Sequence, residues 1–144
     1  MTRVLIVDDQ PAFRANLRQL LSRAGLPVVC EAGDIPEAEA QVLVWQPDLA
    51  VVDVRLPGLN GLEGTRRLKA LAPALRVIVV SACGDEWQAL QIAAIEAGAE
   101  QFVAKEDLEL RQVETWKTPH EGISPSPGSV EQPPERKPGA PVMK

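Results

Sequence analysis

The chain has 144 residues, 45% of them hydrophobic and 24% charged, and a formal net charge of −5 at pH 7. This length suits one ordinary domain with an appendage, and the acidic balance argues against a duplex nucleic acid as partner, since phosphate binding wants clustered Lys and Arg. Without an apolar stretch of about 18 residues or a secretory leader pattern, we expect a cytoplasmic protein that does not contact a membrane. Cys30 and Cys83 lack metal-binding spacing, and we expect packed thiols without a catalytic role, Cys83 being the more exposed.

The chain opens with an apolar run and then a helical pattern. Val4–Val7 is an unbroken run of apolar residues, which is typical of a strand buried on both faces of a parallel sheet. Pro11 suits a first helical turn, Gly25 marks the end of that helix, and a second strand is expected over 27–31. The core-facing stripe predicted for this helix is Phe13, Leu17, Leu20, Leu21 and Ala24.

The middle of the chain repeats the alternation. Asp34 is the predicted N-cap of a second helix that ends at Pro47. A third strand over 48–52 delivers Asp53 into a loop, and a helix over 62–71 follows. The residues predicted to face the core are Ile35, Ala38, Val42 and Trp45 from the first of these helices, and Leu68 and Leu71 from the second.

The remaining periodic segments complete the pattern. A fourth strand is expected over 75–80, a helix from near Asp85 to Gly98, and a fifth strand over 101–104. A last, short amphipathic piece covers about 107–116. Strands that alternate with helices in this way predict an α/β fold built on a doubly wound parallel sheet.

Residues 117–144 have a different composition, with seven prolines, three glycines and no aromatic residue. Such a segment lacks the apolar mass needed to offset its ordering entropy, and we predict a disordered Pro-rich tail. The alternative is a tail that packs part of itself against the domain through Val142 and Met143. His120, the single histidine, lies in this segment, so no histidine-based acid/base mechanism is expected.

Polar side chains follow four of the predicted strands. Asp8 and Asp9 come after the first strand, Asp53 after the third, Ser81 after the fourth and Lys105 after the fifth. The carboxyl ends of parallel strands meet at one edge, which is where α/β sheets bind ligands. Neighbouring carboxylates repel one another, and hard oxygen ligands suit Mg²⁺, which would make the cluster tolerable. The set predicts phosphoryl chemistry with a carboxylate as nucleophile.

Together with Leu56-Pro57-Gly58, Asn60-Gly61 and Gly98-Ala99, these residues resemble the receiver domain of bacterial two-component response regulators. The resemblance covers about residues 3–116. It implies a five-stranded, flavodoxin-like parallel sheet with strand order 2-1-3-4-5, flanked by five helices. On this basis the expected organisation is a receiver domain over 1–116 and the Pro-rich tail over 117–144.

The resemblance also implies a role for each site residue. Asp53 would be the phosphoacceptor, charged by a histidine kinase or phosphotransfer protein, with Mg²⁺ as the cofactor. Asp9 looks like the direct metal ligand, and Asp8 would help directly or through water. Asp53 and the backbone carbonyl of Arg55 would be further metal ligands. Lys105 would balance the charge of the phosphoryl group, and Ser81 and Phe102 would form a pair that switches conformation.

Within that family, Asp8-Asp9-Gln10-Pro11 and Lys105-Glu106-Asp107 look closest to receivers that are usually followed by a helix-turn-helix DNA-binding domain. The tail has neither the apolar helices nor the basic residues that DNA reading needs. We therefore expect a stand-alone phosphoacceptor, not an enzyme, that signals to an unidentified downstream protein by contact, without direct DNA binding. A homodimer is a possible state.

Other functional classes fit less well. A phosphohydrolase with an aspartate nucleophile would want a second acid at the position of Arg55, and a dinucleotide oxidoreductase would want G-x-G-x-x-G where Asp8 and Asp9 stand. The strongest alternative is a receiver-like adaptor that docks partners without being phosphorylated. Its expected sign is a broken acidic pocket.

Overall fold

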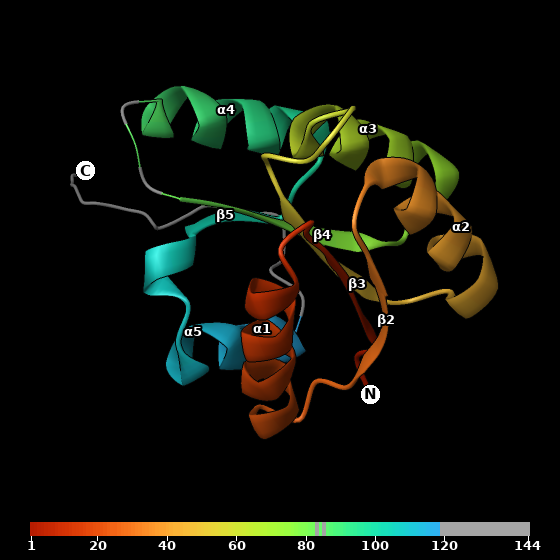
Figure 1. Cartoon of the computed structure of the whole chain (residues 1–144), viewed down its shortest axis with the longest axis vertical. Coiled ribbons are helices and arrows are strands. Elements are labelled where there is room, and N and C mark those ends of the chain that lie inside the picture. Colours follow the sequence, from red (N-terminus) through yellow and green to blue (C-terminus); the bar gives the residue numbers. More distant parts are fainter. Residues whose placement is uncertain (83, 85, 119–144) are drawn as a thin grey trace, which may run out of the picture.

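The computed structural model describes residues 1–82, 84 and 86–118. A parallel sheet of five strands forms the centre, with helices on both faces (Figure 1). The strand order is β2-β1-β3-β4-β5, and each neighbouring pair is parallel. The predicted doubly wound α/β fold and its strand order are confirmed.

The elements follow the alternation predicted from the sequence. The strands are β1 (Val4–Val7), β2 (Val28–Ala32), β3 (Leu49–Asp53), β4 (Arg76–Ser81) and β5 (Gln101–Ala104). The helices are α1 (Pro11–Arg23), α2 (Ile35–Trp45), α3 (Gly61–Leu71), α4 (Trp87–Ala97) and α5 (Leu110–Glu114), with 3₁₀ turns η1 (Lys105–Asp107) and η2 (Thr115–Lys117). The helix start expected at Asp85 lies outside the described residues.

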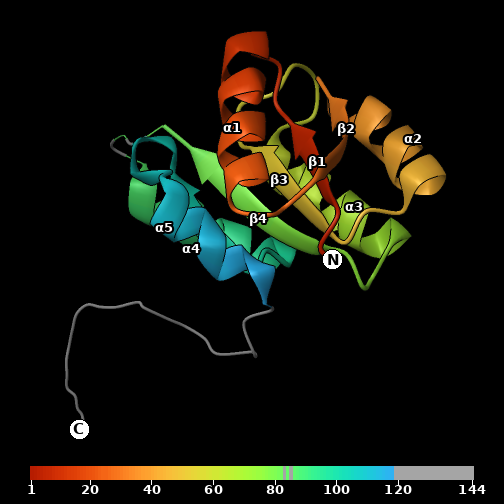
Figure 2. The same cartoon turned by 90° about the horizontal axis from the view of Figure 1, so that it is seen from below.

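Two hydrophobic cores lie on opposite faces of the sheet. α1 and α5 cover one face, while α2, α3 and α4 cover the other (Figures 1 and 2). Alternate residues of β1 serve the two cores, with Val4 and Ile6 on the α1 side and Leu5 and Val7 on the α2 side. The unbroken apolar run of β1 is therefore explained, because both faces of the strand are covered.

Caps and turns fix where the helices begin and end. The Asp34 carboxylate accepts a hydrogen bond from the Glu37 N–H, which confirms the predicted N-cap of α2. Asn60 caps α3 by accepting from the N–H groups of Leu62 and Glu63. Gly98 ends α4 with a φ of 111°, a conformation that favours glycine.

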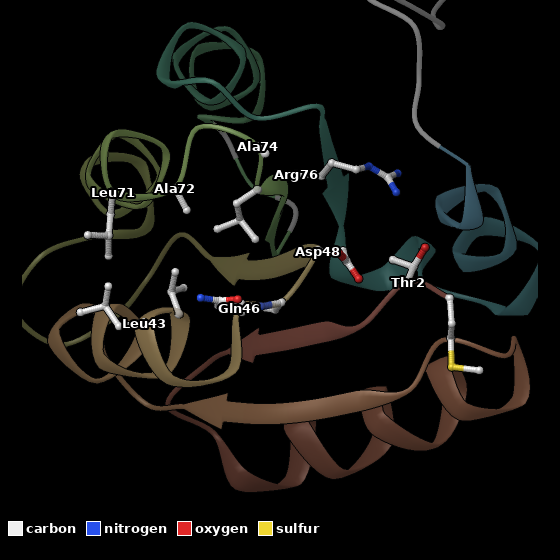
Figure 3. A pocket seen from close by; sticks show the side chains of 12 residues that line it. Thr2, Leu43, Gln46, Asp48, Leu71, Ala72, Ala74 and Arg76 are labelled. Atoms are coloured by element: carbon white, nitrogen blue, oxygen red, sulfur yellow. The ribbon is translucent and has the colours of Figure 1, made fainter.

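Two residues predicted to face the core do not. Trp45 is 47% exposed and Leu71 is 41% exposed. Each is the last residue of its helix, and helices that return between parallel strands end at the edge where the strands begin, beyond the covering layer. Leu71 borders a groove of about 670 Å³ at this edge, which Figure 3 shows together with Leu43, Asp48 and Arg76.

The last predicted helix is interrupted. The segment expected as one amphipathic piece over 107–116 is divided among the end of η1, an extended Glu109, the five-residue α5 and the start of η2. Glu109 has φ −149° and ψ 169°, and its side chain makes no capping hydrogen bond, so the helix begins only at Leu110. Trp116 and Val113 are nonetheless fully buried and complete the core on the α1 side. Cys30 is buried as predicted, whereas Cys83 lies outside the described residues.

Gly61→Ala is expected to destabilise the fold by about 1–3 kcal/mol. An added Cβ would collide with the backbone carbonyl of Asp53 and lie 2.9 Å from the Val54 Cα, so the loop that carries Asp53 would have to move. Urea unfolding followed by tryptophan fluorescence measures the effect. Gly84→Ala is the matched control, because a Cβ there meets nothing within 4 Å; equal midpoints for the two variants would contradict the prediction.

Candidate functional site

The C-terminal edge of the sheet brings the predicted acids and the predicted lysine together. The Lys105 ammonium donates to Asp8 Oδ2 at 2.9 Å and to Asp53 Oδ2 at 3.4 Å. These carboxylates come from the ends of β1 and β3, and the lysine follows β5. Asp8 is 1% exposed and Asp53 is 5% exposed, so both carboxylates and their ion pairs are largely removed from water.

Asp9 completes a cluster of three carboxylates. Asp8, Asp9 and Asp53 each offer one oxygen, and these oxygens all lie within 4.8 Å of one another. Asp9 is exposed while the other two side chains are buried, so the cluster opens to solvent on one side. Three carboxylates against the single ammonium of Lys105 leave an excess of negative charge. Convergent hard oxygen donors with unbalanced charge are the donor set that Mg²⁺ prefers, and the residues fit this ion.

Backbone groups hold the two buried carboxylates in place. The Gln10 N–H donates to Asp8 Oδ1 at 2.7 Å, and the Arg55 N–H donates to Asp53 Oδ1 at 3.3 Å. The Arg14 guanidinium donates to the backbone carbonyl of Asp8 and also pairs with Glu31 at 3.0 Å. The loop backbone thus orients the carboxylate oxygens, and Arg14 of α1 holds the backbone that carries Asp8.

Burial raises the pKa of Asp53 above its ordinary range. The Lys105 ammonium and the Arg55 N–H lower this pKa, and the Asp8 carboxylate raises it further, but burial is the largest influence. The anionic form of Asp53 is therefore incompletely compensated by the protein's own groups. A carboxylate in this state gains from an added cation at the cluster.

Three other residues of the predicted site, Ser81, Phe102 and Arg55, have side chains that contact partners other than the three carboxylates. Ser81 is fully buried at the end of β4, and its hydroxyl donates to the Ala82 carbonyl at 3.2 Å. The ring of Phe102 packs against Trp87 at a centroid distance of 4.4 Å. The Arg55 guanidinium pairs with Glu86 at 3.3 Å on the surface.

Sequence reasoning missed two residues of α1. The helical spacing predicts only a core role for Phe13, yet its ring centroid lies 4.1 Å from the Lys105 Nζ. The spacing predicts no role for Arg14, yet its guanidinium donates to the backbone carbonyl of Asp8. Their position in the sequence could have indicated a place near the site, because they lie one turn after Asp8 and Asp9 on a helix that starts at this edge of the sheet.

A doubly wound parallel sheet with an acidic, lysine-paired pocket at its strand ends defines a receiver-type α/β protein. The chain belongs to the response regulator receiver domain family, whose profile matches residues 4–113. In receivers, an acidic triad such as Asp8, Asp9 and Asp53 is typical of a Mg²⁺ site. Each helix in the part of the chain that the structure describes is too short or too polar to span a bilayer.

Relatives of different lengths share this domain. The chain is 37% identical over 103 residues to the chemotaxis protein CheY of Thermotoga maritima, covering 72% of this chain and 84% of that protein. It is 46% identical over 104 residues to protein-glutamate methylesterase/protein-glutamine glutaminase 5 of Myxococcus xanthus, covering 72% of this chain but only 30% of that protein. The chain therefore spans less than a third of the length of this methylesterase.

Solved structures show the same architecture. A LuxR-family two-component response regulator from Aurantimonas sp. SI85-9A1 superposes with a TM-score of 0.73 at 34% identity, covering 81% of this chain and 83% of that one. A CheX-CheY-BeF3-Mg+2 complex from Borrelia burgdorferi has a TM-score of 0.71 at 27% identity, covering 79% of this chain and 84% of that one. The predicted family is confirmed, and the similar structures include a regulator of the LuxR family.

Proposed function

We propose that this chain is a phosphoacceptor in two-component signalling, in which Asp53 receives a phosphoryl group from a histidine kinase or phosphotransfer protein. The observation that carries the proposal is the convergence of Asp8, Asp9 and Asp53 on one another, with Lys105 bound to two of them. Receiver domains interact with histidine kinases and with downstream proteins. The receiver would span 1–116, and residues 119–144 of the tail lie outside the described residues.

In the proposed reaction a carboxylate oxygen of Asp53 forms a bond to phosphorus. The bond from phosphorus to the donor breaks at the same centre, and the departing group keeps the electron pair. Asp9 and Asp8 would hold Mg²⁺ with Asp53 and the Arg55 carbonyl. When bound, this ion offsets the negative charge of the phosphoryl oxygens. Most of the remaining catalysis is positioning and electrostatics.

Lys105 would follow the charge that arrives on Asp53. Its ammonium already reaches Asp53 Oδ2, so only a short shift separates it from a phosphoryl oxygen. The Ser81 hydroxyl would exchange its Ala82 carbonyl partner for another phosphoryl oxygen. Phe102 would move with it as the second half of the switch, and its contact with Trp87 offers a fluorescence signal for that movement.

The proposed output is contact with a further protein. The chain spans 84% of the length of the chemotaxis protein CheY but only 30% of the length of the methylesterase relative. The unphosphorylated adaptor is not favoured, since the acidic pocket is intact in the described part of the chain. Direct DNA binding is not expected from the acidic composition, and tight sequence-specific DNA binding would contradict this part of the proposal.

Acetyl phosphate and Mg²⁺ provide the direct test. The wild-type chain is expected to gain the mass of one phosphoryl group, and chelation of Mg²⁺ should prevent the gain. Asp53→Asn should remain unmodified, whereas Asp34→Asn serves as a control, because asparagine also caps helices and Asp34 lies outside the carboxylate cluster. An unmodified wild type, or equal labelling of Asp53→Asn, would overturn the proposal.

A further inference from the structure

We propose that Phe13 is a positioning residue that holds the Lys105 ammonium at the phosphoacceptor through a cation–π contact. The Lys105 Nζ lies 4.1 Å from the centroid of the Phe13 ring. An ammonium within about 6 Å of an aromatic face is attracted by the ring quadrupole, and the attraction grows as water is excluded. The inference rests on the proposed function, since it assigns a residue to the same phosphoacceptor site.

The surroundings of Lys105 make this contact significant. The lysine side chain is only 17% exposed, and its ammonium meets Asp8 at 2.9 Å, Asp53 at 3.4 Å and the Phe13 ring at 4.1 Å. Two of these partners are carboxylates and the third is an uncharged ring. Because Lys105 is mostly shielded from water, its cation–π contact is stronger than the same contact at an exposed surface.

Unlike the two carboxylates, the Phe13 ring binds neither metal nor phosphate in the proposed chemistry. Asp8 is a candidate metal ligand and Asp53 is the candidate acceptor, so both must share their oxygens with incoming groups. A divalent cation at these oxygens also repels an ammonium. The Phe13 face takes part in neither role, so its attraction for Lys105 persists. Without it, the flexible four-carbon stem of a lysine has many other positions available.

The fold keeps the ring itself in place. Phe13 lies in the first turn of α1 and packs against the hydrophobic core that contains Leu17 and Leu21. The adjacent Arg14 ties the same turn to the end of β1 through the Asp8 carbonyl. The start of α1 thereby presents a fixed aromatic face to the lysine that follows β5.

The first experiment compares substitutions of Phe13 in the full chain. Phe13→Leu is expected to slow Mg²⁺-dependent phosphorylation by acetyl phosphate about three- to tenfold, because a leucine keeps apolar bulk but has no quadrupole. Phe13→Trp should restore most of the rate, since indole binds cations best. Leu20→Ala is the control: Leu20 is also a half-buried α1 residue on the same core, and its loss should lower the melting temperature while the rate is kept.

Two further measurements separate positioning from structural support. Phenylalanine with increasing ring fluorination at position 13 keeps size nearly constant while weakening the quadrupole, so the rate should fall stepwise. In addition, Phe13→Leu should slow phosphorylation far less in a Lys105→Ala background, because the partner of the ring is gone. Equal rates across the fluorinated series, or an undiminished effect without Lys105, would overturn the inference.

A readout without phosphorylation distinguishes this inference from the proposed function. NMR relaxation of the Lys105 side-chain terminus, measured without a phosphoryl donor, should show greater mobility in Phe13→Leu than in the wild type. Unchanged mobility would overturn the role of Phe13 even if Asp53 is phosphorylated. Increased mobility in a protein that accepts no phosphate would support the contact and refute the proposed function alone.

Discussion

Replacing Lys105 with alanine is expected to lower the free energy of unfolding of the metal-free protein by about 3–5 kcal/mol. The reason is that Asp8 is 1% exposed and would lose its ion-pair partner at 2.9 Å. Asp53, 5% exposed, would lose the same ammonium. Breaking one side of a buried charge pair leaves the other charge uncompensated, which is among the largest effects of a single substitution. Urea unfolding in the presence of a chelator measures it.

The same variant is expected to keep and tighten Mg²⁺ binding. The ammonium no longer competes for the Asp8 and Asp53 oxygens, so added Mg²⁺ should recover much of the lost stability. The fluorescence response of Trp87 to phosphorylation should nevertheless be lost, because the counter-charge to the phosphoryl group is missing. Weaker Mg²⁺ binding, or an unaltered fluorescence response, would contradict this expectation.

Lys69→Ala is the matched control for these measurements. The Lys69 ammonium donates to the carbonyls of Pro73 and Leu75 at 2.8 Å, with no carboxylate among these partners. Its loss removes ordinary hydrogen bonds of about 1 kcal/mol each and should leave Mg²⁺ affinity unchanged. A stability loss as large as that of Lys105→Ala would show that the effect does not come from the acidic pocket.

Asp53→Asn is expected to stabilise the metal-free fold at neutral pH by about 1–3 kcal/mol, the range for a buried polar group that is poorly compensated. Burial raises the pKa of Asp53 above its ordinary value of 3.8, so the folded chain binds this proton more tightly than the unfolded chain does. The contribution of Asp53 to stability is therefore favourable at acid pH. This favourable contribution is lost as the pH rises through the raised pKa. Above that pKa, Asp53 is anionic and its burial destabilises the fold in full.

Melting temperatures of the wild type and Asp53→Asn, measured with a chelator from neutral pH down toward pH 4, provide the test. The advantage of the variant should shrink as the pH falls, because the wild-type Asp53 becomes protonated. Asp9→Asn is the control, since Asp9 belongs to the same cluster but is exposed, and it should change stability little. A variant that is less stable than the wild type at neutral pH would refute the assigned cause.

The fold and the centre of the site were predictable because they depend on coarse patterns. Periodicity located the strands, and parallel strands place their ends at one edge whatever the side-chain details, so Asp8, Asp53 and Lys105 had to meet. Asp34 was predictable as a cap for a similar reason, since its interaction is local in the chain.

The predictions that were wrong or incomplete concern burial and contacts that the periodicity of the sequence does not determine. Trp45 and Leu71 continue the apolar spacing of their helices, but they lie past the covering layer and are about half exposed. Phe13 has the same spacing as the core residues of α1, and the spacing cannot distinguish it from them. Its contact with a cation depends on Lys105, which follows β5 and is distant in the sequence. The rotamer of the Ser81 hydroxyl likewise depends on its surroundings rather than on its neighbours in sequence.

The lysine that pairs with Asp8 lies 97 positions further along the chain, after the edge strand β5. During synthesis on the ribosome, Asp53 is made well before that lysine. A nascent or prematurely terminated product lacking β5 would carry the acceptor aspartate without its cationic partner. Under the proposed function, such a product would lack the counter-charge for the phosphoryl group on Asp53, so a response to phosphorylation would require the complete sheet.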